Sequence, residues 1–376
     1  MKKPLTSPDR WEPIKRFVKF PIERVHIELT NRCNFACSFC PMTMMTRKKG
    51  AMELSLAFKI MDEIAHEEIA EKVVFHIMGE PFLYKELPRV LEYGKKLGLP
   101  TTLSTNGSLL NTETADVLID AGLKKINVSL QTPDARSWSL RGFQGISFDE
   151  YQQRILEFAG RAAERKSSLE VRILVMVTKK RKFLEPYTEK VDIINDDATL
   201  KNVLKDWANK LFDLASGAGD NRYSRDVVMK KLDEVSTGKW QILHVHPNFS
   251  IETYHLDSWG NALGDKSVVP ARIGYCSGIS DHFGVLWDGR VVYCCRDYDG
   301  KTSSGNIRDS SLVDVLNSPS FLKAVYGFNR YLVKHPYCRY CLGGGSMASS
   351  LVKQVGTIFL MNLLRDKFYQ EITLYE

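Results

Sequence analysis

Residues 25–40, VHIELTNRCNFACSFC, determine how the rest of the chain is interpreted. The first six residues alternate between apolar and polar side chains, which predicts a β-strand. Three cysteines then follow in a C-x3-C-x2-C spacing. We therefore expect a short loop with three thiols directly after a strand.

Downstream of this loop, strand-like and helix-like segments alternate. Such alternation indicates parallel βα units with right-handed crossovers, and so an α/β fold. Further strands are predicted at 73–78, 101–105, 125–130, 169–177 and 249–256, and helices at 55–67, 87–97, 112–121 and 148–166.

Residues 179–246 interrupt this alternation. They open with the basic run 179–182, and helical spacing of apolar residues returns at 200–214 and 225–235. We interpret the segment as a mostly helical insertion that covers one mouth of the barrel, with its basic run as a solvated turn.

The composition limits the class of protein. The chain has 376 residues, of which 44% are hydrophobic and 26% charged, as in soluble globular proteins. Its net charge of +7 favours an anionic substrate or an acidic partner, but is too small for a nucleic-acid-binding signature. We expect a cytoplasmic protein without a leader or membrane span, and an amphipathic helix around 355–364 that docks on the body.

The eight cysteines form two groups, at 33–40 and 276–341, with none between them. In a reducing cytosol, clustered cysteines are metal ligands more often than disulfides. Three thiols on one loop suit a 4Fe–4S cluster whose fourth iron stays open for a ligand. A closed zinc site needs four ligands, so zinc is the weaker alternative here.

Together with other motifs, the first cysteine loop resembles that of the radical S-adenosylmethionine (SAM) enzymes. In that family the open iron binds SAM, and the reduced cluster cleaves it to a 5′-deoxyadenosyl radical that abstracts hydrogen from substrate. Residues 78–81, Met-Gly-Glu-Pro, resemble the family's GGE motif. The resemblance implies that Gly79 and Glu80 contact the SAM amino group, and that Phe39 packs beside the cluster and adenine.

The resemblance extends to later strand ends. It implies that Ser104 and Asn106 contact the ribose and carboxylate region of SAM. Ser129 and Arg141 would hold the SAM carboxylate, a role that suits the rigid, always charged guanidinium fork of Arg141. Gln131, in the same strand-end motif, is a further candidate for SAM binding. The hydroxyl group of Ser104 or Ser129 alone would more often bond nearby backbone. Because such polar residues recur at successive strand ends, SAM binding is favoured instead.

The implied fold is a partial (β/α)6 TIM-like barrel with a helical insertion and a small C-terminal α+β auxiliary-cluster domain. The expected division is an N-terminal extension at 1–22, the barrel at 23–260, the auxiliary domain at 261–345 and a C-terminal helix at 346–376.

The second cysteine group resembles the auxiliary iron–sulfur domains, called twitch or SPASM, that follow radical SAM barrels. Its pattern is C-x12-G-x4-C and, after 43 residues, C-x2-C, with a hairpin expected between 284–287 and 291–293. With no later cysteine, the short twitch form with one 4Fe–4S cluster is expected, although a zinc site remains an alternative. The expected ligands are Cys276, Cys294, Cys338 and Cys341, with Cys33, Cys37 and Cys40 for the first cluster. Cys295 is the spare thiol, unless it replaces Cys294.

The cysteine spacing is nearest to that of radical SAM dehydrogenases acting on scyllo-inosamine. This similarity implies oxidation of a small, polar, carbohydrate-like substrate, with the auxiliary cluster as electron acceptor. Alternatives are an epimerase, a peptide-modifying enzyme or a non-enzymatic scaffold. We expect an acidic electron donor such as flavodoxin or ferredoxin as a partner. We expect no binding of nucleic acid. The candidates for a catalytic base or orienting group are Arg172, His255, Asp257 and Asp297.

Overall fold

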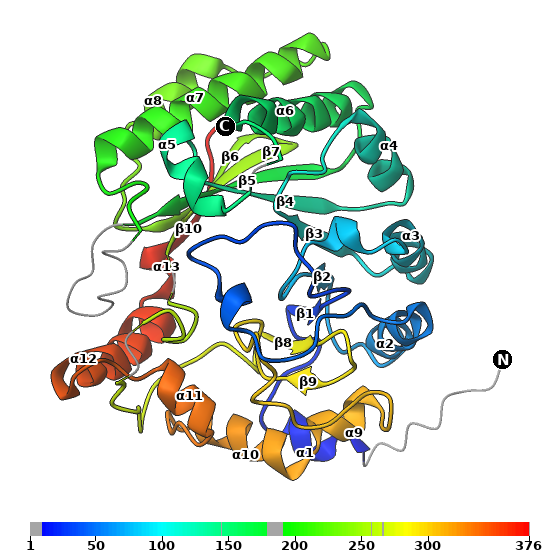
Figure 1. Cartoon of the computed structure of the whole chain (residues 1–376), viewed down its shortest axis with the longest axis vertical. Coiled ribbons are helices and arrows are strands. Elements are labelled where there is room, and N and C mark those ends of the chain that lie inside the picture. Colours follow the sequence, from blue (N-terminus) through cyan, green and yellow to red (C-terminus); the bar gives the residue numbers. More distant parts are fainter. Residues whose placement is uncertain (1–9, 144, 179–190, 257, 265–266, 376) are drawn as a thin grey trace.

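The structure is a computed structural model that describes residues 10–143, 145–178, 191–256, 258–264 and 267–375. A ten-stranded sheet curves through the molecule in the order β10-β6-β7-β5-β4-β3-β2-β1-β8-β9 (Figure 1). The strands are β1 (Arg24–Ile27), β2 (Val73–Phe75), β3 (Thr101–Thr105), β4 (Lys125–Gln131), β5 (Glu170–Val177), β6 (Trp240–His246), β7 (Phe249–His255), β8 (His282–Val285), β9 (Val291–Val292) and β10 (Tyr369–Thr373).

Helices surround this sheet on its outer side (Figure 1). Caps define where several of them begin: Asn111 and Thr114 form a capping box at α4, and Ser147 accepts from Glu150 N at α6. The α-helices are α1 (Glu12–Lys15), α2 (Leu54–His66), α3 (Leu87–Leu97), α4 (Thr112–Asp120), α5 (Ala135–Trp138), α6 (Phe148–Glu164), α7 (Asp197–Gly217), α8 (Arg225–Leu232), α9 (Leu312–Leu316), α10 (Pro319–Phe328), α11 (Pro336–Cys341), α12 (Met347–Ile358) and α13 (Arg365–Phe368). Short 3-10 turns are η2 (Pro41–Met44), η3 (Pro81–Leu83) and η4 (Ser139–Arg141), and η6 (Phe359–Leu363) is a π-turn.

Six strands, β1 to β5 and β7, are parallel neighbours, which confirms the α/β fold and the partial barrel. The side chains of these strands alternate between two environments. Val25 and Ile27 belong to the main apolar core, whereas Ser129 and Gln131 reach the central cavity described below. Because parallel strands end at one edge, their last residues meet around that cavity.

The auxiliary hairpin joins the barrel directly. β8 pairs in parallel with β1 over Arg24–Ile27 and His282–Val285, and β9 pairs antiparallel with β8. Gly289, at φ +91°, closes the hairpin; a Cβ there would lie 2.4 Å from Asn306 Oδ1. The barrel and the auxiliary region thus share one sheet.

The predicted insertion differs from expectation. Its described part, 191–246, is indeed mostly helical, but α7 packs beside α6 and against β6 and β7 on the outer side. Apolar side chains of α7, including Leu204, Trp207 and Leu211, are buried there. β6 then pairs antiparallel with β7 and extends the sheet. The described insertion therefore replaces a barrel helix rather than covering a mouth, and its basic run lies outside the described residues.

The C-terminal region is more than the predicted helix. After α12, η6 and α13, residues 369–373 form β10, which pairs in parallel with β6. The interpretation of 346–376 as a helix was therefore wrong at its end. The pairing of β10 with β6 joins segments far apart in the sequence, and such a contact leaves no periodicity within the segment itself.

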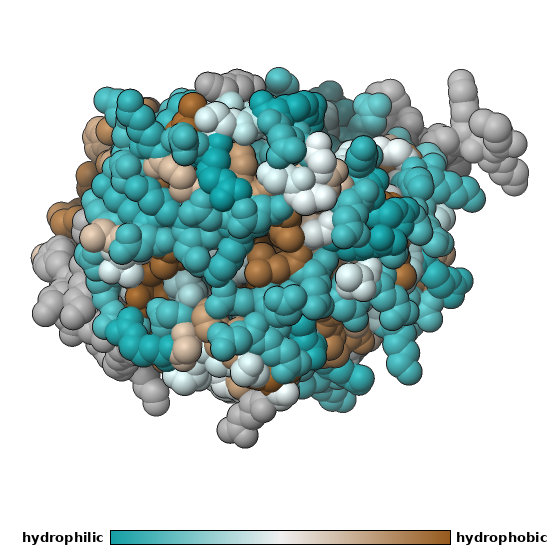
Figure 2. Space-filling model, turned by 90° about the horizontal axis from the view of Figure 1, so that it is seen from above, coloured by the Kyte–Doolittle hydropathy of each residue, from teal (hydrophilic) through white to brown (hydrophobic). Residues whose placement is uncertain are grey.

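The described part of the N-terminal extension packs against the auxiliary region. Trp11, Ile14 and Val18 are buried, and Ile14 N donates to Asn317 Oδ1 at 3.0 Å. Among the described residues, no helix has the length and apolar character needed to cross a membrane. The face in Figure 2 is mainly hydrophilic, with small separate hydrophobic patches.

Candidate active site and auxiliary metal centre

The first cysteine loop lies where β1 ends. Two hydrogen bonds hold its backbone to η4: Ala36 N donates to Arg141 O at 3.2 Å, and Ser38 N donates to Leu140 O at 2.8 Å. All three of its cysteines line a central cavity of about 170 Å³. Burial raises the pKa of the Cys40 thiol to about 12, so a thiolate there requires a cation beside it.

The cavity collects most of the residues predicted to contact SAM. Side chains and backbone from the ends of successive strands meet there, as the parallel sheet requires. The predicted residues that line it are Phe39, Gly79, Ser104, Asn106, Ser129, Gln131 and Arg141, together with Cys33, Cys37 and Cys40.

Arg141 is the main buried cation of the cavity wall, with 1% of its surface exposed. Its Nη1 donates to Gln131 Oε1, and its Nη2 donates to Asn106 O at 3.4 Å. The guanidinium lies 4.8 Å from the centre of the Phe35 ring. Its Nε is buried without a hydrogen-bond partner, which leaves one donor for an anionic ligand.

Glu80 is placed differently from the other predicted SAM contacts. Its carboxylate accepts from Asn106 N at 2.7 Å, Thr105 Oγ1 at 2.8 Å and Phe82 N at 3.2 Å. Burial raises its pKa to about 7. Glu80 does not appear among the cavity-lining residues, and its bonds tie the loop after β2 to the end of β3.

The neighbouring Gly79 permits a close approach of two loops. It has φ +86°, and a Cβ there would lie 2.3 Å from Thr30 O and 2.8 Å from Arg32 O. Any side chain would therefore clash with the backbone that follows β1. The requirement for glycine has a structural cause here, besides the predicted contact with SAM.

These residues fit the cofactors that the motifs imply. Three cavity-lining thiols supply a cluster with one open iron. The unpaired Nε of Arg141 suits a carboxylate, and Asn106 and Gln131 add amide groups to the same cavity. Cys33, Cys37 and Cys40 would hold the cluster, and Arg141 would orient SAM.

Among the described residues, the predicted base candidates Arg172, His255 and Asp297 do not line the cavity. Arg172 lies near the start of β5, where it contacts Glu170 at 2.9 Å and Glu252 at 3.2 Å. His255 Nε2 is 2.8 Å from Thr237 O. Asp297 is fully buried and accepts from the backbone N of residues 301 and 302 and from the hydroxyl of residue 302. Asp257 lies outside the described residues.

Sequence reasoning missed several residues of the cavity wall. Tyr254 accepts from Gln131 Nε2 at 2.5 Å, and Met176 pairs with it across β5 and β7. The period-two alternation of β7 could have identified Tyr254 instead of its neighbour His255, since adjacent strand residues face opposite sides. His76 also lines the cavity, and burial lowers its pKa to about 4.

The auxiliary cysteines gather around Cys294. Burial and the neighbouring cysteines raise the pKa of the Cys294 thiol well above its usual value. α11 supplies two of these neighbours, and small residues leave room beside the thiols: a Cβ on Gly278 would lie 3.3 Å from Cys276 Sγ, and one on Gly260 would lie 2.9 Å from Cys341 Sγ. A 4Fe–4S cluster fits this set, namely Cys276, Cys294, Cys338 and Cys341.

Cys295 has a different environment. Its Sγ lies within 4.8 Å of ring nitrogens of His26 and His282, both more than nine-tenths buried. The trio has the residue types of a metal site, but Arg24 Nε donates to His26 Nε2 at 3.2 Å. A metal-bound imidazole instead donates its second N–H to an acceptor. We therefore assign no metal to this trio.

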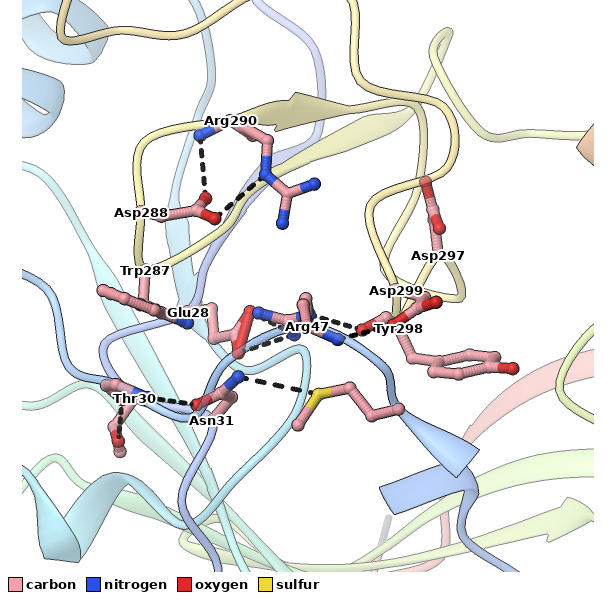
Figure 3. Close-up of polar contacts among 12 residues, drawn as sticks. Glu28, Thr30, Asn31, Arg47, Trp287, Asp288, Arg290, Asp297, Tyr298 and Asp299 are labelled. Carbon is pink, nitrogen blue, oxygen red and sulfur yellow. Dashed lines mark hydrogen bonds and ion pairs between the residues drawn. The ribbon is translucent and has the colours of Figure 1, made fainter. Parts of the chain in front are cut away.

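Polar contacts fasten the auxiliary region to the segment after the first cysteine loop (Figure 3). Arg47 ion-pairs with Glu28 at 2.7 Å and donates from Nε to Tyr298 O at 2.6 Å. Asp299 accepts from Thr46 N and Thr46 Oγ1, each at 2.7 Å. Burial raises the pKa of Glu28 to about 7, against the charge of Arg47.

Comparison with protein families agrees with both centres. Residues 27–179 match the radical SAM superfamily, and residues 276–342 match SPASM, an iron–sulfur cluster-binding domain. The first range contains the three cavity cysteines, and the second contains the five auxiliary ones.

The relatives cover different shares of the chain. The tungsten-containing aldehyde ferredoxin oxidoreductase cofactor-modifying protein of Pyrococcus furiosus is 22% identical over 84% of this chain and 86% of its own length. The S-adenosyl-L-methionine-dependent 2-deoxy-scyllo-inosamine dehydrogenase of Niallia circulans is 28% identical over 28% of this chain, which spans less than half (43%) of that relative's length.

Among solved structures, Streptococcus suis SuiB bound to precursor peptide SuiA is similar in fold. It has a TM-score of 0.55 at 16% identity, over 94% of this chain and 80% of that one. The two matched domains, each coinciding with a cysteine group, imply SAM and two 4Fe–4S clusters as cofactors. The chain is therefore an enzyme of the radical SAM superfamily with a C-terminal auxiliary iron–sulfur domain.

Proposed function

We propose that this enzyme dehydrogenates a small polar substrate, converting an alcohol to a ketone. The observation that carries this proposal is the auxiliary centre. Its four gathered cysteines can ligate every iron of a 4Fe–4S cluster, which leaves no open iron for substrate. A closed cluster suits electron transfer.

An apolar group contacts both the first cysteine loop and Cys295, the chain neighbour of the expected ligand Cys294. Ile77, Met78, Leu286, Val292 and Tyr298 form a separate buried cluster that packs against both Cys40 and Cys295. Close packing of this kind leaves little room for water beside Cys40 and Cys295. It supports electron transfer from a substrate in the cavity toward the second centre.

When bound, SAM and the reduced first cluster supply a 5′-deoxyadenosyl radical, which removes one hydrogen atom from the substrate carbon. To complete the oxidation, the substrate must lose one electron and the proton of its hydroxyl group. The electron passes toward the auxiliary site, and we assign the proton to His76, the cavity-lining imidazole. Loss of the electron makes the hydroxyl strongly acidic, so a base with a pKa of about 4 suffices.

The proposal is tested with anaerobic holoenzyme, reductant, SAM and a panel of aminocyclitols and sugars carrying deuterium on the oxidised carbon. A ketone two mass units lighter than an unlabelled substrate, with deuterium transferred to 5′-deoxyadenosine, supports dehydrogenation. His76→Ala should keep the deuterium transfer and lose most of the ketone.

Two outcomes would replace this proposal. A product of unchanged mass that contains solvent deuterium would identify an epimerase. Turnover of a peptide, with no reaction on the panel, would favour peptide modification, for which the fold similarity to SuiB bound to a precursor peptide is the supporting observation.

A further inference from the structure

Helix α12 attaches to the body of the protein through polar side chains. Ser350 and Gln354 are buried beneath it. Ser350 Oγ donates to Val269 O at 3.0 Å, and Gln354 Oε1 accepts from the backbone N of Arg272 at 2.9 Å and of Ile273 at 3.1 Å. This arrangement inverts the usual amphipathic helix, which buries its apolar face.

The opposite face of α12 and its continuation is apolar and exposed, at the outer edge of the molecule (Figure 1). The expectation that residues 355–364 dock on the body is therefore wrong for these side chains. Among the sixteen large apolar residues exposed in the described chain, nine lie between 347 and 364. We call these nine the C-terminal apolar face: Met347, Leu351, Val352, Val355, Phe359, Leu360, Met361, Leu363 and Leu364.

The face has the pattern of a helix that packs against another helix. Residues four apart lie in rows along a helix, and such rows interlock with the grooves of a partner. Within this face Gly356 forms a notch, because a Cβ there would find no atom within 4 Å. Within α12 one row is Met347, Leu351 and Val355, and the next contains Val352 and Gly356, whereas the apolar residues of 359–364 belong to the π-turn η6 and its end.

The charge of this segment decides which partner it suits. Between 347 and 364 the only charged residue is Lys353, and its Nζ donates to Asn261 Oδ1 at 3.1 Å. An uncharged face does not repel its own copy. A membrane-surface helix carries several basic residues on its polar face, whereas the one cation here, Lys353, is bonded to Asn261 of the body. An acidic electron donor would likewise require a basic surface.

We propose that the C-terminal apolar face binds the same face of a second copy of this chain, forming a two-fold symmetric dimer. In such an interface the same residues contribute from both copies. Rows of one α12 would cross the other at the Gly356 notch, where the missing side chain permits close approach of the two helices. The inference is independent of the reaction.

Two substitutions and a control test it by sedimentation velocity on the anaerobic holoenzyme at micromolar concentrations. Leu351→Glu places like charges in the interface, and Gly356→Leu fills the notch. Each should raise the dimer dissociation constant by roughly tenfold or more. Val117→Glu, at a similarly exposed apolar site on α4, should leave the dimer unchanged.

Gly356→Leu also separates protein from lipid as the occupant. The added side chain should weaken a dimer, but it should tighten binding to vesicles if lipid covered the face. A wild type that is monomeric, with or without binding to anionic vesicles, would overturn the proposal. A dimer that survives both substitutions would overturn it as well, since its interface would lie elsewhere.

Discussion

Each of two regions of the barrel buries an arginine, and the two residues differ in their partners. Arg172, near the start of β5, is surrounded by Glu170, Glu252 and Ser250, which together accept from all three of its nitrogens. Arg141, at the cavity, binds one amide and one carbonyl, and its Nε has no partner. A fully paired buried charge indicates a structural role, whereas an incompletely paired one indicates a ligand site.

Removing the metal ligands beside Arg141 should have the largest effect. Changing Cys33, Cys37 and Cys40 together to Ala should lower the bound iron from about eight to about four atoms per chain. All cleavage of SAM to 5′-deoxyadenosine should stop. Iron analysis and product chromatography after anaerobic reconstitution provide the measurement.

Cys295→Ser is the matched control for that triple variant. Because Cys295 lies beside His26 and His282, this variant should retain about eight irons. Loss of four irons would show instead that Cys295 is a cluster ligand. Two zinc ions in place of iron in the wild type would contradict the radical SAM chemistry.

At the start of β5, Arg172→Met should destabilise the fold and leave SAM binding intact. It removes the partner of two largely buried carboxylates, which typically costs about 3–5 kcal/mol. Chemical unfolding monitored by circular dichroism would show the loss, and Arg172→Lys should recover part of it. Weakened SAM binding in a folded Arg172→Met protein would contradict the purely structural role of Arg172.

At the cavity, Arg141→Met should weaken SAM binding and leave the stability of the fold nearly unchanged. Losing a charge-assisted hydrogen bond should weaken SAM by about 1.5–3 kcal/mol, or roughly 10- to 150-fold in dissociation constant. Anaerobic calorimetry measures this change, while the unfolding midpoint should move little. An unchanged SAM affinity would show that Arg141 does not bind SAM.

The smallest expected effect is a pH dependence that comes from Glu170. Burial raises the pKa of this carboxyl, but Arg172 and Lys125 lower it to a net value of about 2. Its folded-state pKa is below the unfolded value, so its stabilising contribution is complete above pH ~4.5 and is lost as the pH falls toward 2.

Between pH 5 and 3 the wild type should therefore lose about 1–2 kcal/mol more unfolding free energy than Glu170→Gln. Unfolding curves at both pH values measure the difference. If the wild type and Glu170→Gln lost the same unfolding free energy, Arg172 would pair mainly with Glu252.

The local order of elements could be predicted from sequence, because alternation and cysteine spacing are local signals. The strand-end residues of the cavity came from the resemblance of their motifs to those of radical SAM enzymes. Three features could not be predicted from the sequence: the place of α7, the pairing of β8 with β1, and the pairing of β10 with β6. Each depends on contacts between distant segments, for which a single sequence has no periodicity.

The predicted roles of polar residues were less secure than their positions. The sequence predicts Arg172 and Asp297 as candidates because a catalytic base is expected on a barrel strand or on the auxiliary hairpin. Their hydrogen bonds, to Glu170 and to the backbone of residues 301 and 302, are structural. Which buried charge has a spare donor is visible only once the neighbours are placed.

The shared sheet limits how this protein can be divided. β1 has β8 along one side, and β6 has β10 along one side. A fragment that stopped at residue 260 would leave both of these edges unpaired. Exposed strand edges bind other edges and aggregate. An engineered barrel that exchanges its auxiliary domain must therefore keep both β8 and β10, or cover both edges by other means.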